Sequence, residues 1–157
     1  MRCAAVIPSN DGRVAMIERI RDERTYYVFP GGGLAEGETP QEAMIREVHE
    51  ELGLLVSPER LLAEVQTQDE PQLYFLAREV GGRFGQGVGK EVRGLNPPED
   101  GIYNPVLVAF AALKLIDGWP RKLLDVVADV PAVGWPDHVL RFREQPSSPD
   151  AGHTRAA

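Results

Sequence analysis

The chain has 157 residues, of which 43% are hydrophobic and 26% are charged, and these values are typical of one globular domain with a single core. Its formal net charge of −7 argues against a function built on duplex nucleic acid, because an acidic chain repels phosphates, although a local basic pocket remains compatible with it. The single cysteine excludes an intrachain disulfide. The sequence shows neither a leader pattern nor a run near ~18 apolar residues, so we expect a cytoplasmic protein without a membrane span.

The first strand patterns lie at the N-terminus. Residues 3–8 and 13–18 are apolar runs separated by Ser-Asn-Asp-Gly, and this arrangement predicts a hairpin. Cys3 lies in the first run and is expected to be a core residue rather than a nucleophile. Residues 26–29 are aromatic and β-branched, which predicts a short strand that ends at a proline and three glycines.

The second half of the chain alternates between strands and a long loop. Residues 61–68 and 73–80 are predicted as two strands joined by a tight turn. Residues 81–104 are rich in glycine and form a predicted loop, and a loop of this length is more often mobile or directed toward a substrate than a simple connector. A further strand is predicted at residues 105–109 and a helix at residues 122–130.

The order of these elements predicts a single mixed α/β layered domain over residues 1–144. Residues 145–157 are polar and rich in small residues, and we expect a disordered tail there. An edge strand at residues 3–8 or at residues 105–109 could pair with a second copy, which leaves a homodimer open.

The clearest helix signal covers residues 40–52. Thr39 can serve as the N-cap, Pro40 suits the first helical position, and Glu42 completes a capping box. Gly53 is a natural left-handed terminator. The apolar residues fall in one stripe that would pack against a sheet, namely Met44, Ile45, Val48 and Leu52.

A second sector of this helix, clear of the apolar stripe, carries three carboxylates. Glu47, Glu50 and Glu51 fall within ~100° of one another on the helical wheel, so they repel each other unless a cation compensates them. Mg²⁺ prefers a few carboxylates together with water and substrate phosphate oxygens. Arg46 precedes Glu50 by four residues and can hold that carboxylate in place.

A glycine turn at residues 29–33 precedes the helix and exposes main-chain groups that a metal or a phosphate can approach closely. Each feature alone has a plain interpretation. An acidic helix face is usually only solvated, and a run of glycines is usually only a turn between a strand and a helix. The plain turn does not explain the acidic face beside it.

The two features together resemble the signature of the Nudix hydrolase family, MutT-like pyrophosphohydrolases, G-x5-E-x7-R-E-U-x-E-E-x-G-U, where U is apolar. The matching positions run from Gly32 through Glu38, Arg46-Glu47-Val48 and Glu50-Glu51 to Gly53-Leu54, and every defined position agrees. The order of the flanking strands also resembles the family over residues 5–130. The resemblance implies an α/β/α sandwich around a mixed β-sheet, and hydrolysis of a nucleoside diphosphate linked to another moiety, X.

The resemblance also implies a metal site. Carried over by position, Glu47, Glu50 and Glu51 would be ligands of Mg²⁺, with Mn²⁺ as a substitute. The family's backbone carbonyl ligand would fall on Gly31. Metals of this kind neutralise the diphosphate and activate a water for in-line attack, which needs no covalent nucleophile.

Other residues of the signature would support this chemistry. Arg46 is expected to orient the catalytic carboxylates. The general base differs among family members, and the candidates here are Glu50, Glu51 and, on the later loop, Glu91, whose other interpretation is an exposed loop charge. Structural support is expected from Glu38, Gly32 and Gly53.

The identity of X stays open at this point. A nucleoside triphosphate is favoured slightly, because the chain lacks a long N-terminal extension that could build a swapped dimer. ADP-ribose or another nucleotide sugar is the first alternative, and isoprenoid or inositol diphosphates are further alternatives. A catalytically silent nucleotide sensor is the alternative of another class, although the signature carboxylates are all present. An RNA-binding or structural domain is disfavoured by the acidic charge.

Contacts to the substrate are less defined. Arg19, Arg21 and Arg24 precede a predicted strand and either reach phosphates near the cleft or are ordinary surface charges. Four aromatic residues are either stacking partners for a base or, more commonly for such residues, core: Tyr26, Tyr27, Phe75 and Tyr103.

Overall fold

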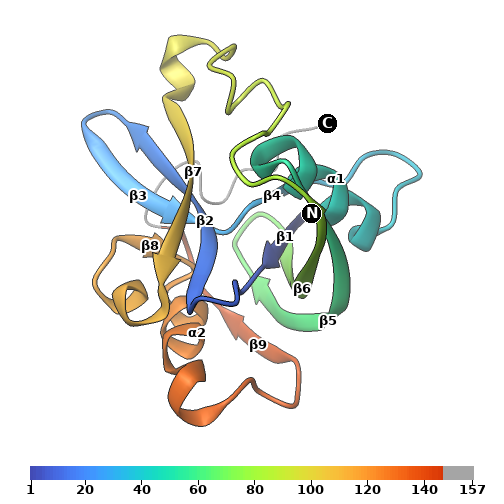
Figure 1. Ribbon diagram of the computed structural model, residues 1–157, viewed down its shortest axis with the longest axis vertical. Coiled ribbons are helices and arrows are strands. Elements are labelled where there is room, and N and C mark those ends of the chain that lie inside the picture. The colour runs from blue at the N-terminus through green and yellow to red at the C-terminus, as the bar shows by residue number, and fades with distance from the viewer. Residues whose placement is uncertain (147–157) are drawn as a thin grey trace.

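The structure, a computed structural model, describes residues 1–146 and contains two α-helices and two mixed β-sheets (Figure 1). The elements are β1 (Arg2–Val6), β2 (Arg13–Arg21), β3 (Arg24–Val28), β4 (Gly31–Gly33), α1 (Pro40–Leu52), β5 (Leu54–Gln66), β6 (Pro71–Gly82), β7 (Ile102–Ala109), β8 (Gly118–Trp119), α2 (Arg121–Val133) and β9 (Leu140–Arg143), with 3₁₀ turns at Pro98–Asp100 and Phe110–Lys114. The five-stranded sheet has the order β4-β1-β6-β5-β9, and the four-stranded sheet has the order β7-β2-β3-β8. The predicted mixed α/β class is confirmed.

The predicted N-terminal hairpin forms only at its turn. The Ser9 amide donates to the Arg13 carbonyl over 2.7 Å, and the Ala15 amide donates to the Ile7 carbonyl over 3.2 Å. Beyond the turn the strands separate, since β1 pairs with β4 and β6 whereas β2 pairs with β3 and β7. The reason is visible in burial, because both apolar runs are buried continuously rather than on alternate residues, as inner strands require.

The same pairing corrects one expectation about edge strands. Residues 3–8 do not provide an edge, because β1 lies between β4 and β6. The other predicted edge is present, since β7 is the outermost strand of the four-stranded sheet.

The remaining predicted strands and the second helix are present and longer than expected. β5 and β6 form one extended antiparallel pair, and α2 extends to Val133. β4, β8 and β9 were not predicted because each has only two to four residues. β4 consists of glycine alone, and β8 is Gly-Trp, so neither carries a strand pattern. Glu144 follows β9, and its carboxylate accepts from the backbone amides of Arg121 and Lys122, so it caps the start of α2.

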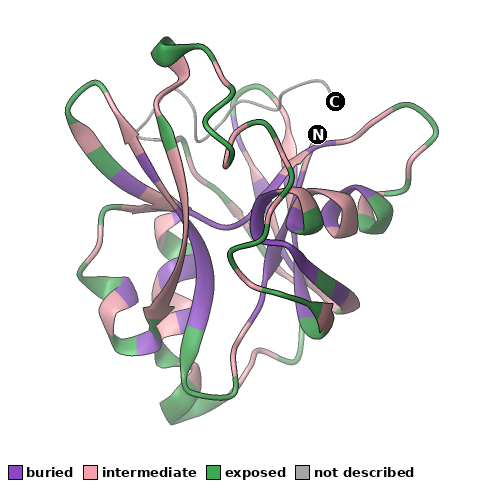
Figure 2. Cartoon of the chain, turned by 45° about the horizontal axis from the view of Figure 1, so that its top comes forward, coloured by how far each residue is buried: buried purple, intermediate pink, exposed green. Residues whose placement is uncertain are grey.

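The core is formed by the central strands of the two sheets and by the inner faces of α1 and α2 (Figure 2). Phe29, Tyr74 and Trp119 form a chain of edge-to-face contacts, with ring centroids 5.8 and 6.5 Å apart. Cys3 is fully buried, as predicted, and burial raises the pKa of its thiol to about 11. Helix α1 packs against β1, β4 and β5, and α2 packs beside β8.

Two further expectations concern the chain as a whole. In the part of the chain that the structure describes, no helix is long and apolar enough to cross a membrane. Most of the expected C-terminal tail, residues 147–157, lies outside the described residues.

Candidate active site

Helix α1 begins and ends as the sequence predicts. The Thr39 hydroxyl accepts from the Glu42 amide over 3.2 Å, and the Glu42 carboxylate accepts from the Thr39 amide over 2.8 Å, which forms the capping box. Gly53 ends the helix in the left-handed conformation, with φ of 77°. Met44, Val48 and Leu52 of the predicted stripe are fully buried, so this side of α1 packs into the core.

Arg46 is the organising residue of the acidic side of α1. Its Nε and Nη2 donate to the two carboxylate oxygens of Glu38 over 2.7 and 3.1 Å, and Nη2 also donates to the Gly33 carbonyl over 2.9 Å. Its Nη1 donates to Glu47 over 2.8 Å and contacts Glu50 at 3.5 Å. The predicted pair with Glu50 is therefore the weakest of its contacts, and the two-pronged bond to Glu38 ties the helix to the preceding loop.

Glu51 is the most buried carboxylate of the helix, with 7% of the residue exposed. Its Oε2 accepts from the Gly31 amide over 3.0 Å, which fixes the side chain against the glycine turn. Burial raises the pKa of Glu51 to about 8, while the charge of Arg2 acts in the opposite direction. Without a nearby cation, ionisation of this carboxylate is therefore unfavourable.

The two other carboxylates differ in their surroundings. Burial raises the pKa of Glu47 although Arg46 bonds to it, so desolvation outweighs the ion pair. Gly32 lies directly under Glu47, and a Cβ at that position would overlap its carboxylate. Glu50 is the most accessible of the three, with 37% of its side chain exposed.

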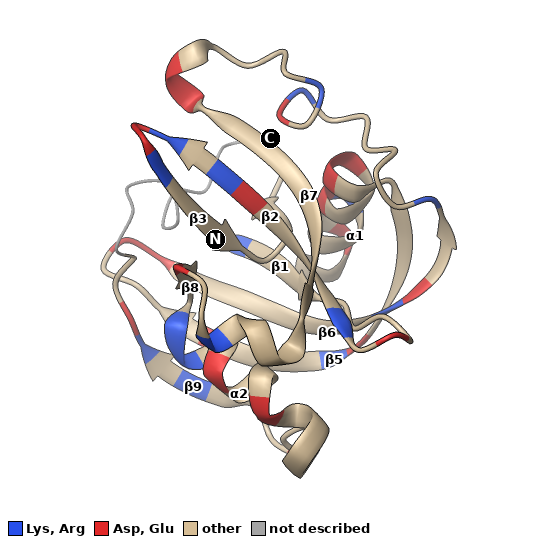
Figure 3. Ribbon diagram, turned by 60° about the vertical axis from the view of Figure 1, so that its left-hand side comes forward, with Lys and Arg blue, Asp and Glu red and all other residues tan. Residues whose placement is uncertain are grey.

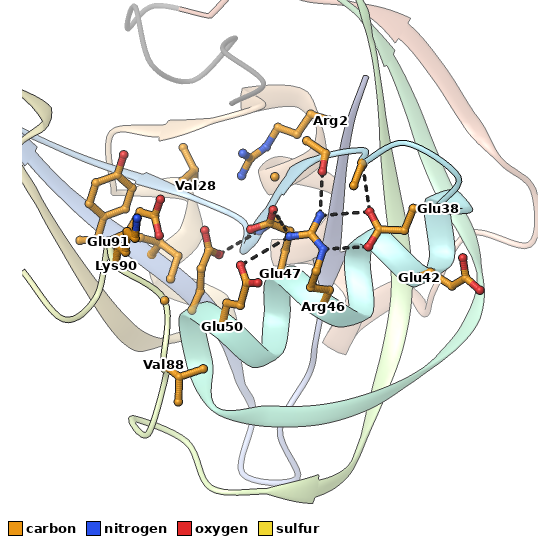
Figure 4. A pocket seen from close by; sticks show the side chains of 18 of the residues that line it. Arg2, Val28, Glu38, Glu42, Arg46, Glu47, Glu50, Val88, Lys90 and Glu91 are labelled. Carbon is orange, nitrogen blue, oxygen red and sulfur yellow. Dashed lines mark hydrogen bonds and ion pairs between the residues drawn. The ribbon is translucent and has the colours of Figure 1, made fainter. Parts of the chain in front are cut away.

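These carboxylates line one open cavity of about 850 Å³, which is large enough for a nucleotide-sized ligand. Figure 4 shows Arg46 between Glu38 and the carboxylates of Glu47 and Glu50. The side of the cavity formed by Glu47, Glu50 and Glu51 of α1 is its acidic wall. The lining residues that bear on its chemistry are Arg2, Arg19, Gly31, Gly32, Glu38, Arg46, Glu47, Glu50, Glu51, Lys90, Glu91 and Tyr103.

The glycine-rich loop at residues 83–101 contributes a second wall. The Gly85 amide donates to the Leu52 carbonyl over 2.9 Å, and the Gly89 amide donates to the Glu50 carbonyl over 2.8 Å. A Cβ at Gly87 would lie 2.6 Å from the Glu50 carbonyl, so only glycine allows the loop to approach the end of α1 this closely. This contact brings Lys90 and Glu91 to the cavity that the α1 carboxylates line.

The third wall comes from the four-stranded sheet. Arg19 is 4% exposed, and its guanidinium lies 3.4 Å from the ring centroid of Tyr103. Its Nη2 donates to the Asp100 carbonyl over 2.7 Å, which connects this wall to the end of the loop. Figure 3 shows the contrast in charge, with acidic positions along α1 and basic positions on β2 and β3.

The structure therefore separates the weaker candidates. Arg19 and Tyr103 line the cavity, and for Arg19 the interpretation as a surface charge is wrong. Arg24 does not line it, because it pairs with Asp117 at 2.8 Å on another part of the surface. The other three aromatic candidates do not line the cavity. Tyr26 and Phe75 are buried in the core, and the Tyr27 hydroxyl donates to Glu18. Arg2 and Lys90 line the cavity and were not among the candidates.

The residues present fit a divalent cation in their chemistry. Glu47 and Glu51 are carboxylates whose burial opposes ionisation, and a hard cation with oxygen ligands removes that penalty. Within residues 1–146 no group of three or more His, Cys, Asp or Glu side chains is already arranged to hold a metal ion. Arg46 Nη1 lies between the carboxylates of Glu47 and Glu50 and contributes the positive charge there.

A substitution at Gly32 tests the fit between the glycine turn and the helix. We expect Gly32→Ala to displace the Glu47 carboxylate, because the new methyl group would overlap it. The flexible side chain moves more easily than the backbone, so the free energy of unfolding should change by only about 1 kcal/mol. Activity should fall at least about tenfold. Gly85→Ala, where a Cβ meets nothing within 4 Å but φ is 88°, separates a steric effect at the site from general strain. Full activity of Gly32→Ala would contradict the expectation.

The buried Glu51 predicts a pH dependence of stability in EDTA. Its folded-state pKa of about 8 is above the ordinary value of 4.5, so the folded protein retains a proton that the unfolded chain releases. The resulting stabilisation is complete below about pH 4.5 and is lost as the pH rises to about 8. Between about pH 5 and pH 8.5, Glu51→Gln should therefore gain on the order of 4 kcal/mol relative to wild type in urea unfolding. Parallel curves for the two proteins would contradict this assignment.

Comparison with known proteins agrees with this geometry. A family model described as the NUDIX domain matches residues 1–122. An RNA pyrophosphohydrolase of Francisella tularensis is 62% identical over 34 residues, which is 22% of this chain and 22% of that protein. The chain thus matches only a short part of this curated relative.

Solved structures share the fold over most of the chain. An ADP-ribose pyrophosphatase from Streptococcus suis has a TM-score of 0.60 at 16% identity, covering 91% of this chain and 97% of that one. A NUDIX hydrolase from Nitrosomonas europaea has a TM-score of 0.63 at 21% identity, covering 85% and 89%. At these identities the likeness shows the common fold.

Proposed function

Because this chain belongs to the NUDIX domain family, we propose that it is a Mg²⁺-dependent pyrophosphohydrolase that cuts the diphosphate of a nucleoside diphosphate linked to X. The observation that carries the proposal is the acidic wall of the cavity. Glu47, Glu50 and Glu51 line it together, and two of them are desolvated to a degree that a cation would compensate. A merely solvated acidic face would not be buried in this way.

In this proposal Glu47, Glu50, Glu51 and the Gly31 carbonyl hold the cation. When bound, Mg²⁺ supplies neutralisation of the diphosphate charge and activation of water, and Mn²⁺ can replace it. Arg46 keeps the carboxylates in place through its bonds to the loop and helix. A water oxygen forms a new bond to phosphorus, the anhydride bond to the leaving phosphate breaks, and a carboxylate accepts the water proton.

Three carboxylates remain candidates for the general base. Glu51 bonds to the Gly31 amide and is held rigidly, Glu50 is more accessible, and Glu91 lies across the cavity on the loop. The pH–rate profiles of Glu50→Gln and Glu91→Gln distinguish them, because loss of the base removes the acidic limb of the profile.

For X we propose a nucleoside triphosphate in first place. The cavity contains Arg2, Arg19 and Lys90 in addition to the acidic wall, and these cations suit a substrate with more negative charge than one diphosphate. The Arg19–Tyr103 pair offers a flat face to a base or sugar. ADP-ribose remains the alternative, since the solved relative from Streptococcus suis is an ADP-ribose pyrophosphatase. A silent sensor is the alternative of another class.

A panel of substrates with identified products tests this proposal. It contains canonical and oxidised nucleoside triphosphates, ADP-ribose, diadenosine polyphosphates, isoprenoid diphosphates and a short RNA with a 5′-triphosphate. A nucleoside monophosphate with pyrophosphate identifies a triphosphate substrate, whereas AMP with ribose 5-phosphate identifies ADP-ribose. Binding of nucleotides without turnover of any member would favour the sensor.

A homodimer through β7 also remains a proposal. β7 is an edge strand whose residues are mostly half-buried, and its free edge could pair with a second copy. Light scattering of wild type and of Leu107→Lys gives the mass directly. An unchanged monomeric mass for both proteins would exclude this dimer.

A further inference from the structure

Arg2 is one of the cavity's cations, and its own contacts suggest a more specific role than its charge alone. It is the first residue of β1, in register with Gly33 of β4 and Gln72 of β6. The residue is half-buried and lines the same cavity as the α1 carboxylates. In Figure 4 its guanidinium points into the cavity above the side chains of Glu47 and Arg46.

The contacts of Arg2 fix its position without neutralising it. Nη2 donates to the Phe29 carbonyl over 2.8 Å, which is an uncharged acceptor. The guanidinium also lies near the Tyr74 hydroxyl, where burial raises the tyrosine pKa and Arg2 lowers it. Among the described residues, no carboxylate lies within 4.0 Å of Arg2, in contrast to Arg46, which pairs with three.

A guanidinium in this position can bind a further anion. Removing an arginine from water is costly unless a negative group compensates it, and the Phe29 carbonyl satisfies only part of its five donors. The carboxylates of the cavity do not provide that group at bonding distance, although Arg2 acts on Glu51 electrostatically. An anion that enters the cavity beside Arg2 would meet the remaining donors of its guanidinium.

We propose that Arg2 is a substrate-binding residue that donates hydrogen bonds to a phosphate oxygen of the diphosphate, from the start of β1 beside the α1 carboxylates. This inference rests on the proposed function, because it takes the diphosphate to lie in this cavity. The guanidinium of Arg2 then holds a phosphate oxygen next to the carboxylates of Glu47, Glu50 and Glu51, which would hold a divalent cation. Such a clamp orients the phosphorus for in-line attack.

Calorimetric titration with inorganic pyrophosphate in the presence of Mg²⁺ tests the inference without requiring turnover. Arg2→Gln should weaken pyrophosphate binding about 10- to 100-fold, as loss of a charge-assisted bond predicts. Arg2→Lys should restore part of the affinity, because the lysine keeps the charge but loses the fork of donors. The matched control is Arg13→Gln, an exposed arginine paired with Asp11 at 2.6 Å, and it should bind pyrophosphate as wild type does.

A second titration, with Mn²⁺ alone, separates substrate binding from a structural role. If Arg2 binds the phosphate, its removal takes a positive charge away from the carboxylates, so Mn²⁺ affinity should stay constant or rise while pyrophosphate affinity falls. A parallel loss of both affinities would show that Arg2 only supports the fold of the site and would overturn the inference. Wild-type pyrophosphate affinity in Arg2→Gln, or no pyrophosphate binding to wild type, would also overturn it. If the wild-type protein turns over no substrate of the panel but Arg2→Gln still loses pyrophosphate binding, the phosphate-binding role of Arg2 is supported and only the proposed function is refuted.

Discussion

Replacing Glu51 with glutamine is expected to lower kcat about 1,000-fold, with little change in the fold. Glutamine has nearly the same shape and its amide oxygen can still accept from the Gly31 amide, as Glu51 does over 3.0 Å. It cannot carry the negative charge that the proposed metal site requires. The loss should therefore appear in the chemical step and in the Mg²⁺ concentration needed for half-maximal rate.

The control for this variant is an exposed glutamate outside the cavity. Glu59 has 46% of its side chain exposed and pairs with Arg78 at 3.8 Å. Glu59→Gln should keep the activity of wild type, and circular dichroism should show that both variants are folded. Activity of Glu51→Gln within about tenfold of wild type would mean that this carboxylate neither holds the metal nor accepts the proton.

Removal of Arg46 is expected to have the largest effect on stability. Arg46→Met leaves Glu38 and Glu47 without their cation and the Gly33 carbonyl without its donor, at positions where the carboxylate side chains are 15% and 14% exposed. Breaking a largely buried ion pair in this way should reduce the free energy of unfolding by about 2–4 kcal/mol. Urea unfolding measures this change, and kcat should fall as well because the carboxylates lose their alignment.

Two variants show whether geometry or charge is responsible. Arg46→Lys keeps the charge but cannot bond to both oxygens of Glu38, so it should recover less than half of the lost stability. Arg13→Met removes an exposed ion pair and should change stability by less than about 1 kcal/mol. Equal stability of Arg46→Met and Arg13→Met would show that the Arg46 network contributes nothing to the fold.

The helix and its acidic side could be predicted because their determinants are local. A capping box, a proline at the first turn and a terminal glycine fix α1 within the sequence, and the spacing of Glu47, Glu50 and Glu51 fixes their common side. The same locality explains the prediction that Glu38 and Arg46 support the site. Their bond spans only eight positions of the chain.

The division into two sheets could not be predicted from local patterns. The turn at residues 9–12 is present, but continuous burial of both strands by distant partners separates β1 from β2. The position of Arg2 depends on the same long-range pairing, since β6, which lies beside it, begins at Pro71. A single arginine before an apolar run carries no sequence signal that distinguishes it from a surface charge.

The contribution of the loop was predictable only in part. Its glycine content indicated an unusual loop, yet the reason for Gly87 became visible only where its backbone contacts the Glu50 and Glu51 carbonyls. For Arg19 the sequence favoured a surface position, because a charged residue near a strand end is usually exposed. In the structure its guanidinium stacks on Tyr103 and the residue is buried.

The most direct test of the central claim is the rate of diphosphate hydrolysis by the wild-type protein as Mg²⁺ is added, removed with EDTA and added again. The substrate is the best member of the panel described above. The claim predicts turnover that EDTA abolishes and that excess Mg²⁺ restores, with no restoration in Glu51→Gln. Turnover that persists in EDTA, or an equal rate in Glu51→Gln, would contradict a metal site on the acidic wall of α1.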